Sequence, residues 1–415
     1  MKFLRGGDKV SQIAIGQMGV DWEERISFDK LRKERKEKAK NAIEDSDLSA
    51  LFTFSMHDTR YITGFRGHLG PGTFRFGSWA TTVLPKHGEP ILYTKDLEHA
   101  RKRMSWIDDE NIQHTKNLLH PGRVPKWAED VKERIGDDAK GKIGIDRAIP
   151  LSYLNALKES FPKAEFVDGT GVINNAKMIK TSEEIKCQKI ATAITESGFS
   201  FAMDYMRPGV RECEVLAKAW ERFTALGSEW SQCANIVTSG PNTAPYRRIT
   251  SDRIIMSGDL VIIDIGACFN GYWGDWTRTY LCGKDGGITE EMKDLYQESY
   301  DALFNAISKA TPGNTTLDII KEIDTENSYG LSSAHGCGVN PWEPPLIARG
   351  VEETELKPDM LINIEPYAGK PGVGGVRLEN QIRVTENEPE ILSTYPFDER
   401  LLHQTHPLDE TTPEP

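Results

Sequence analysis

The spacing of apolar and polar residues predicts that the first part of the chain mixes helices with short strands. Apolar side chains recur at helical spacing among many charges in residues 28–46, which predicts an amphipathic helix. Residues 51–54 form an apolar run that is typical of a buried strand. Residues 79–84 and 90–94 flank a Lys-His-Gly-Glu turn and predict a hairpin, and residues 142–145 predict a further strand.

Longer helices are predicted beyond residue 180. Thr181 and Glu184 match a capping box, in which each side chain accepts a hydrogen bond from the other residue's backbone N–H. This pair predicts a helix that begins there and runs to about Tyr205. A Pro-Gly pair ends it, and a second helix is predicted at residues 212–226.

The order of helix, Pro-Gly and helix occurs twice in this second part. The Pro-Gly pairs stand at 208–209 and 312–313, about 100 residues apart, and the later pair precedes a helix that opens near Thr315. Strand-rich stretches at 254–281 and 360–384 follow the two helix pairs. The pattern indicates a duplicated αβ unit.

These elements predict an α+β protein with two domains. We expect an N-terminal domain at residues 1–175, in which 165–175 connect to the second part, and a C-terminal domain at residues 176–402. A chain of 415 residues is long enough for each part to bury its own core. Residues 403–415 are polar and rich in proline, so we expect a flexible tail.

The charge balance argues against a nucleic-acid or anionic-membrane partner. The 51 Lys and Arg against 63 Asp and Glu give a net charge of −12, whereas phosphate binding needs clustered cations. The six cysteines form no CxxC pair, as in a reduced intracellular protein. No run of about 18 apolar residues predicts a membrane span, and the N-terminus does not read as a signal peptide. A cytoplasmic location is therefore expected.

Two aspartates stand on a predicted hairpin with unusual chemistry. Asp264 ends an apolar strand, an Asn-Gly turn follows, and a return strand carries Asp275. Taken alone, Asp264 has a structural reading as a turn cap and Asp275 as a partner of Arg278. A carboxylate at the end of an apolar strand nevertheless carries a large desolvation cost unless it meets a cation. The hairpin is thus a candidate metal site.

Three later residues extend this candidate site. His335 lies in a glycine-rich segment and is the only histidine between His120 and His403. Glu365 ends an apolar strand, and Glu379 lies inside another. Four carboxylates that converge would repel one another without a cation. Four carboxylates and one imidazole suit two divalent ions such as Mn, Fe, Co or Zn, which together activate a water and polarise a substrate oxygen.

The order of the motifs DIG…GYxxDxTRT, HGxG, IEP and GVRxEN…VTE resembles that of the creatinase/aminopeptidase P/prolidase superfamily. The resemblance implies a "pita-bread" C-terminal domain, with two pseudo-symmetric αβ halves around a curved antiparallel sheet. It also implies a smaller creatinase-like α/β N-terminal domain and a homodimer. The metal positions that it implies are Asp264, Asp275, His335, Glu365 and Glu379.

The chain departs from the peptidases of this superfamily at two positions. They carry a histidine in a segment like SGxNxxxPH, where this chain has Tyr246. They carry another in a pattern like HGxGxxxHExP, where this chain has Trp342. One interpretation is that other chemistry has replaced Xaa-Pro hydrolysis. The other is that Tyr246, Arg247 or Glu343 substitutes for the histidines in a slow or narrow peptidase.

A closer likeness is to the dimethylsulfoniopropionate lyase branch of the superfamily. The segment GSEWSQCANIVTSGPNTAPY, the residues YPFD at 395–398 and the missing histidines resemble that branch. Three positions depart from it. Gly266 and Glu379 stand where the branch has metal-binding aspartates, and Pro341 stands where it has a proposed catalytic aspartate. The metal ligands therefore resemble those of the peptidases, whereas the substrate-facing residues do not.

The first hypothesis is a lyase-like β-elimination, or a C–N hydrolysis, on a small molecule. Its candidate bases are Tyr246, Glu343 and Tyr329, and its candidate substrate-binding residues are Trp230, Trp342 and Arg377. The second hypothesis is an Xaa-Pro aminopeptidase or dipeptidase with substituted proton-transfer residues, so that the partner is a small molecule or a short peptide. The third is a catalytically silent binding protein, which the five retained metal positions disfavour.

Overall fold

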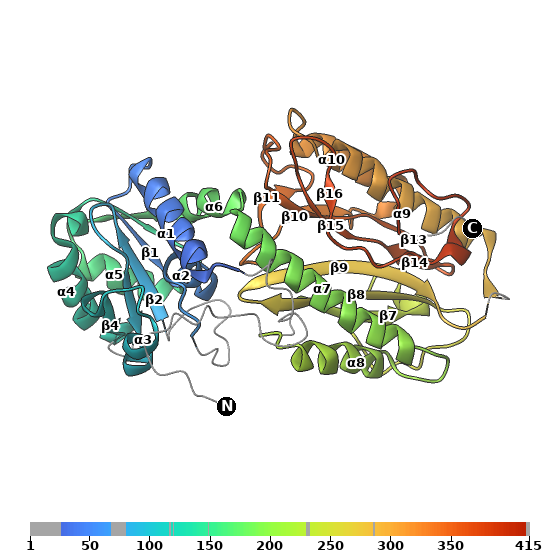
Figure 1. The fold of residues 1–415 in the computed structure, drawn as a ribbon, viewed down its shortest axis with the longest axis horizontal. Helices are drawn as coiled ribbons and strands as arrows, with labels where there is room; N and C mark the ends of the chain where they lie inside the picture. The colour runs from blue at the N-terminus through green and yellow to red at the C-terminus, as the bar shows by residue number, and fades with distance from the viewer. Residues whose placement is uncertain are drawn as a thin grey trace, which may run out of the picture. The chain divides into compact units, whose positions relative to one another are not determined.

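In a computed structural model, the chain folds into two compact units (Figure 1). The described residues are 26–67, 80–115, 118, 120–147, 149–229, 233–284 and 287–411. The N-terminal unit comprises Ser27–Lys177, and the C-terminal unit begins at Met178.

One sheet organises the N-terminal unit, with the strand order β4-β3-β2-β1-β5-β6. The strands are β1 Ala50–Thr53, β2 Ala80–Pro85, β3 Ile91–Thr94, β4 Ile112–His114, β5 Lys142–Ile145 and β6 Glu165–Asp168. Strand β2 pairs antiparallel with both β1 and β3, whereas β1 pairs parallel with β5. The predicted hairpin is confirmed, because β2 and β3 are its two arms.

Helices cover this sheet and close its core. They are α1 Phe28–Glu44, α2 Met56–Thr63, α3 Leu97–Arg103, α4 Val124–Ile135, α5 Leu151–Ser160 and α6 Thr170–Met178. Trp127 of α4 meets Phe52 of β1 edge to face, with ring centroids 5.5 Å apart, in a core that α4 and α5 share with the strands. The connector expected at 165–175 is wrong, since its backbone adds β6 to the free edge of β5 and then starts α6.

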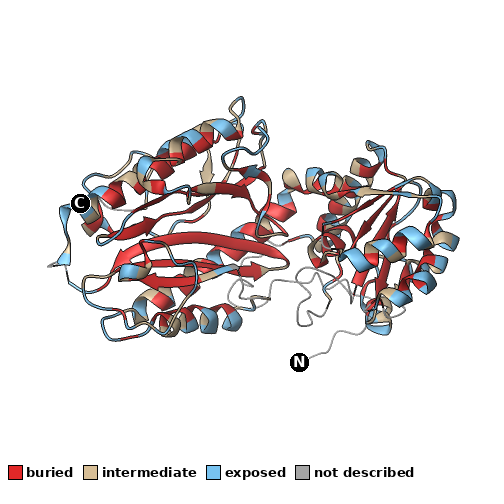
Figure 2. Cartoon of the chain, turned by 180° about the vertical axis from the view of Figure 1, so that it is seen from behind, coloured by how far each residue is buried: buried red, intermediate tan, exposed pale blue. Residues whose placement is uncertain are grey.

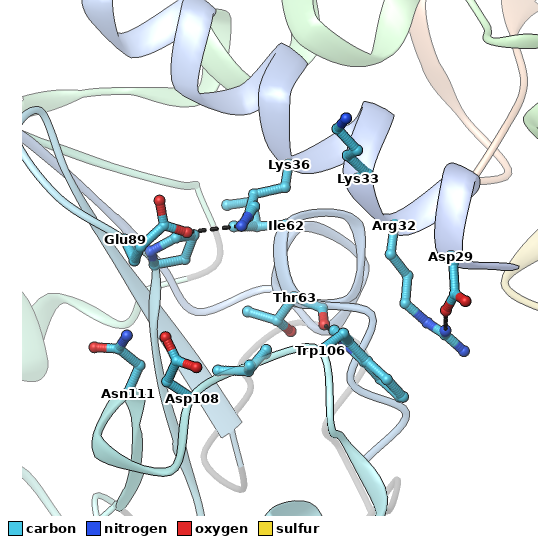
Figure 3. A pocket seen from close by; sticks show the side chains of 12 residues that line it. Asp29, Arg32, Lys33, Lys36, Ile62, Thr63, Glu89, Trp106, Asp108 and Asn111 are labelled. Atoms are coloured by element: carbon cyan, nitrogen blue, oxygen red, sulfur yellow. Dashed lines mark hydrogen bonds and ion pairs between the residues drawn. The ribbon is translucent and has the colours of Figure 1, made fainter. Parts of the chain in front are cut away.

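A cavity of about 390 Å³ lies within the N-terminal unit (Figure 3). The guanidinium of Arg32 lies 3.7 Å above the ring of Trp106, and Lys36 pairs with Glu89 at 2.7 Å. Cations and anions both line it, so that it has no dominant charge. None of the residues predicted for the functional site belongs to this lining.

The C-terminal unit pairs helices with strands twice. Its helices are α7 Ser182–Tyr205, α8 Glu212–Ala225, α9 Glu290–Lys309 and α10 Thr316–Ile323. Its strands are β7 Cys233–Ser239, β8 Leu260–Phe269, β9 Tyr272–Leu281, β10 Ser333–Gly336, β11 Glu343–Ile347, β12 Leu361–Glu365, β13 Tyr367–Lys370, β14 Gly374–Arg377, β15 Asn380–Arg383 and β16 Glu390–Ile391. They form sheets of the orders β7-β8-β9, β11-β10-β12-β15-β16 and β13-β14.

The two halves are layered alike. One core joins α7 and α8 to the β7-β8-β9 sheet, and another joins α9 and α10 to the larger sheet. The strands are buried between the helix pairs, whose outer faces are exposed (Figure 2). The predicted repeat and the capping box are confirmed: Glu184 Oε2 accepts from the Thr181 N–H at 2.9 Å, which fixes the start of α7. No helix of the described residues has the length and apolar content to cross a membrane.

The described end of the chain, residues 403–411, follows α9 instead of extending as the flexible tail that was expected. The backbone N–H of His403 donates to Gln297 Oε1 at 2.9 Å. The hydroxyl of Tyr300 donates to Asp409 Oδ2 at 2.8 Å. These contacts supply the polar partners that a proline-rich composition does not reveal.

Candidate metal centre

The hairpin of β8 and β9 brings the two aspartates to one face. Asn270 and Gly271 form its turn, both with positive φ (49° and 88°), which suits the twist of a two-residue hairpin. Asp264 stands opposite Thr277, and Asp275 stands opposite Gly266. Asp264 and Asp275 are therefore diagonal neighbours on the same face of the hairpin, as the sequence predicted.

The larger sheet supplies the imidazole and the glutamates. Strand β10 pairs antiparallel with β12, so that His335 lies opposite Asn363 and Ser333 lies opposite Glu365. His335 and Glu365 are thus diagonal neighbours, with His335 Nε2 3.9 Å from Glu365 Oε1. Glu379 directly precedes β15, the next strand of the same sheet.

Three of the five predicted ligands converge. Asp275, His335 and Glu379 are buried, and each offers a ligand atom within 4.8 Å of the other two. Hydrogen bonds fix the Glu379 carboxylate, which accepts from Thr277 Oγ1 at 2.8 Å and from Asn363 Nδ2 at 2.9 Å. The three side chains come from a hairpin and a separate sheet, so only the tertiary fold makes this group.

Asp264 and Glu365 lie beside this group and share a cation. The buried guanidinium of Arg377 forms an ion pair with Glu365, and its Nε lies 3.8 Å from Asp264 Oδ2. Ser333 Oγ also donates to Glu365. Arg377 thus contacts two predicted metal ligands, and the substrate-binding role expected of it stays a prediction.

Burial makes the charged forms of the carboxylates unfavourable. It raises the pKa of Glu379 to about 7, with a further contribution from the negative charge of Asp264. Burial likewise raises the pKa of Asp264, and Arg377 only partly offsets this. Two buried acids that repel one another need a cation if both are to ionise.

The imidazole of His335 is prepared to act as a ligand. Burial lowers its pKa to about 4, so the ring is neutral near pH 7. Its Nδ1 lies 3.0 Å from the Gly336 carbonyl, to which it must donate. This leaves the Nε2 lone pair without a hydrogen-bond partner among the described residues, as is also true of Asp264 Oδ1. Because these two buried atoms have lone pairs that no hydrogen bond within the described residues uses, they can coordinate a divalent metal ion.

Tyr246 lies next to this centre. Its ring stacks on Tyr367 at 5.4 Å between centroids, and its buried hydroxyl has no regular hydrogen bond to the described residues. Burial and the charge of Asp264 raise the pKa of Tyr246 well above its usual value. The phenol is therefore protonated at neutral pH, and its hydroxyl can donate a hydrogen bond.

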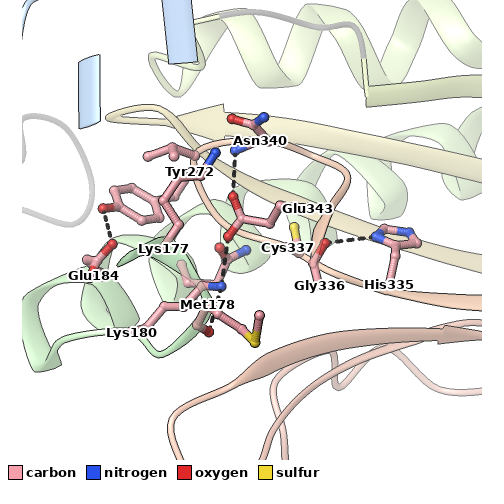
Figure 4. A network of polar contacts seen from close by, with 12 residues as sticks. Lys177, Met178, Lys180, Glu184, Tyr272, His335, Gly336, Cys337, Asn340 and Glu343 are labelled. Atoms are coloured by element: carbon pink, nitrogen blue, oxygen red, sulfur yellow. Dashed lines mark hydrogen bonds and ion pairs between the residues drawn. The ribbon is translucent and has the colours of Figure 1, made fainter. Parts of the chain in front are cut away.

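Glu343 lies in a different polar network (Figure 4). Its Oε1 is 2.8 Å from Lys180 Nζ, both side chains are buried, and the Asn340 N–H donates to Oε2 at 3.3 Å. This buried ion pair gives Glu343 a partner outside the group of converging ligands, and the base role expected of it stays a prediction. The sequence does not show that Lys180 reaches it.

The remaining candidates differ in exposure. Tyr329 is a surface residue, because its side chain is 63% exposed. Its backbone is left-handed, with φ 51°. Trp342 is half-exposed and stacks on His335. Trp230 lies outside the described residues.

Sequence reasoning missed the residues that hold Glu379. Thr277 stands two positions after Asp275, in the same motif, and Asn363 is a fully buried polar residue between apolar neighbours of β12. The polar side chain of Asn363 at an inward strand position is the signal that could have identified it. Its Nδ2 also donates to the Asp275 carbonyl at 2.7 Å, which ties the hairpin to the larger sheet.

A buried group of carboxylates and one imidazole lies between the two αβ halves, and these are donor types that bind divalent metal ions. Residues 186–386 match the model of metallopeptidase family M24, and residues 35–179 match the creatinase/prolidase N-terminal domain. The Xaa-Pro dipeptidase of Pyrococcus furiosus is 35% identical over 362 residues, which cover 86% of this chain and 96% of that relative. The chain therefore belongs to metallopeptidase family M24 and is a metal-dependent hydrolase.

Solved structures agree with this assignment. An Xaa-Pro dipeptidase from Bacillus anthracis superposes with a TM-score of 0.73 at 27% identity, over 88% of this chain and 99% of that one. The prolidase from Pyrococcus horikoshii OT3 gives 0.72 at 26% identity, over 87% and 98%. The superfamily and its pita-bread fold are thus confirmed. The likeness to the lyase branch finds no support among these relatives, which favour the peptidase that was the second hypothesis.

Proposed function

We propose that this protein is an Xaa-Pro dipeptidase that acts on short peptides through a metal centre. The observation that carries the proposal is the convergence of Asp275, His335 and Glu379 at a buried site, where His335 Nε2 accepts no hydrogen bond from the described residues. Relatives named Xaa-Pro dipeptidase and prolidase, which align over most of their length, support this substrate class.

The centre is proposed to hold two divalent ions, of Mn, Fe, Co or Zn. The proposed ligands are Asp264, Asp275, His335, Glu365 and Glu379. Bound ions supply an activated water and polarise the scissile carbonyl. Oxygen ligands with one imidazole suit these metals, whereas a cysteine-based structural zinc site has a different donor set.

The chain's own residues then have separate tasks. Thr277 and Asn363 orient the carboxylate of Glu379. Tyr246, protonated at neutral pH, is placed to donate a hydrogen bond from its hydroxyl, at the position where the resemblance to the superfamily implies a histidine. Trp342 presents an apolar ring where the second histidine is expected. We therefore propose a peptidase that is slower than relatives with both histidines. The homodimer and the cytoplasmic location stay predictions.

The test is a paired assay on protein reconstituted with Mn or Co. Ala-Pro, a panel of Xaa-Pro dipeptides and Xaa-Pro-Xaa tripeptides are incubated beside dimethylsulfoniopropionate. We expect metal-dependent release of proline, which His335→Ala abolishes. Glu352→Gln, a change at an exposed carboxylate outside the proposed set of ligands, is the matched control and keeps the activity. Release of dimethyl sulfide without peptide cleavage would overturn the proposal.

A further inference from the structure

The buried carboxylate of Glu212 accepts hydrogen bonds from five donors. Glu212 is the first residue of α8 and is fully buried. Its Oε1 accepts from the Ser239 N–H and hydroxyl, both at 2.8 Å, and from Asn242 Nδ2 at 3.2 Å. Its Oε2 accepts from the Ser251 N–H at 3.0 Å and from the Ser251 hydroxyl at 2.5 Å. These hydrogen bonds offset the desolvation cost of an ionised group that lies away from water.

The five donors come from the two ends of one loop. Ser239 is the last residue of β7, and Ser251 directly follows residues 240–250, which we call the 240–250 loop. The side chain of Glu212 therefore joins the two ends of this loop. The loop carries Tyr246, whose ring lies next to the candidate metal centre.

The loop has further attachments on both sides of Tyr246. Before it, the Thr243 carbonyl accepts from the Tyr367 hydroxyl at 2.6 Å. After it, the Thr250 hydroxyl accepts from a backbone N–H of β7 at 2.8 Å. Loss of the Glu212 contacts would therefore loosen the ends of the loop, while Thr243 and Thr250 keep contacts of their own.

The second αβ half shows how the same position is built without a carboxylate. Glu212 and Thr316 stand at the same distance after the two Pro-Gly pairs. The Glu212 N–H donates to the Arg253 carbonyl at 3.0 Å, and in the same way the Thr316 N–H donates to a carbonyl, that of Thr354, at 2.9 Å. The Thr316 hydroxyl accepts from the Thr354 N–H at 3.0 Å. The helix start thus needs no carboxylate, and the carboxylate stands in the half whose loop carries Tyr246.

We infer that Glu212 is a positioning residue for the reaction, because it holds the loop that presents the Tyr246 hydroxyl to the metal centre. The catalytic part of this inference rests on the proposed function, whereas attachment of the loop is measured without metal or substrate. Glu212→Gln keeps the shape of the side chain but replaces one acceptor oxygen by an NH2 group, which only donates. Whichever oxygen is replaced, at least two of the five hydrogen bonds are lost.

The first measurement is limited proteolysis of the full chain with trypsin, which cleaves after Arg and Lys. Arg247 and Arg248 are exposed residues of the 240–250 loop, and cleavage after them requires local opening of the loop. Glu212→Gln should raise the rate of cleavage there by at least about tenfold, because hydrogen bonds to a charged group are lost. Mass spectrometry identifies the sites, and cleavage elsewhere should keep the wild-type rate.

Glu214→Gln is the matched control. Glu214 lies on the same helix and accepts from the Arg211 N–H at 2.7 Å, which a glutamine oxygen can also do. Its cleavage pattern should match that of wild type. Ser251→Ala removes one donor and keeps the carboxylate, so it should give a smaller increase, and it tests the inference if Glu212→Gln does not fold. Rates equal to those of Glu214→Gln in both variants would show that Glu212 does not hold the loop.

The second measurement is a double-mutant cycle on kcat for Ala-Pro with the metal-loaded full chain. Glu212→Gln should lower kcat by about tenfold in wild type and change it little in Tyr246→Phe, which already lacks the hydroxyl. An equal decrease in both backgrounds would mean that Glu212 does not act through Tyr246, and the inference would be wrong while the peptidase assignment stands. A wild type that cleaves no Xaa-Pro peptide overturns the proposed function, and the trypsin result then still decides whether Glu212 holds the loop.

Discussion

The indole of Trp342 stacks on the imidazole of His335, with ring centroids 4.5 Å apart and ring planes inclined by 23°. Trp342 is 53% exposed, so the stack covers the buried His335 from the solvent side. The sequence places Trp342 where related peptidases carry a histidine. The indole of Trp342 therefore occupies a position at which the resemblance to the superfamily implies a proton-transferring side chain.

Trp342→His is expected to raise Xaa-Pro hydrolysis. A positioned imidazole contributes to proton transfer by about 100-fold or more in enzymes that use one, so a gain of about tenfold in kcat is expected for an unoptimised graft. The measurement is kcat for Ala-Pro with saturating metal, beside Trp342→Phe, which keeps an aromatic ring and should give no gain. Equal rates for the two variants would show that no histidine is missing.

Thr277→Val is expected to weaken metal binding without unfolding the protein. The threonine hydroxyl donates to Glu379, and loss of such an orienting hydrogen bond typically costs about 10–100-fold in metal affinity. Metal titration by calorimetry measures the effect. Thr224→Val, at an exposed position of α8, is the control and should bind metal like wild type. A Thr277→Val affinity equal to that of the control would remove Thr277 from the site.

Lys180→Met is expected to destabilise the C-terminal unit by about 3–5 kcal/mol, because it leaves the carboxylate of Glu343 buried and unpaired. Urea unfolding measures the change. The double variant Lys180→Met/Glu343→Leu should recover part of the loss, since it removes both charges. Lys218→Met, which breaks the exposed pair with Glu221, serves as the control and should change stability little. A single variant as stable as this control would contradict the prediction.

His335 is expected to make the metal-free protein sensitive to acid. Its pKa falls from 6.5 to about 4 on folding, so the unfolded chain binds a proton first as the pH decreases. Stability from this residue is therefore full above about pH 6.5 and is lost as the pH falls toward 4, by up to about 3 kcal/mol. The contribution of Glu379 has the opposite sign, because its pKa is raised on folding.

Comparison with His335→Gln separates the two contributions, since Glu379 is present in both proteins. Unfolding free energies are measured between pH 4 and 7.5 with a chelator present. Wild type should lose more stability than His335→Gln as the pH falls through this range. Parallel profiles for the two proteins would mean that His335 is not held neutral by burial.

The sequence predicted the local elements of the C-terminal unit well. The capping box of Thr181 and Glu184, the Asn-Gly turn before β9 and the Pro-Gly pairs are short-range signals, because each depends on residues close along the chain. Local sequence signals did not predict the strand β6 and the start of helix α6 within residues 165–175. Strand β6 exists because β5 has a free edge to pair with, and that is not a property of the segment itself.

The sequence by itself determined the family motifs, the α+β class and the identity of the candidate ligands, since these depend on residue type and spacing. Only the tertiary structure decided which side chains meet. It brought Asp275, His335 and Glu379 together, paired Glu365 with Arg377, and paired Glu343 with Lys180. The physical reason is that electrostatic pairing and burial depend on distances across strands and sheets, which residues far apart in sequence acquire only when the chain has folded.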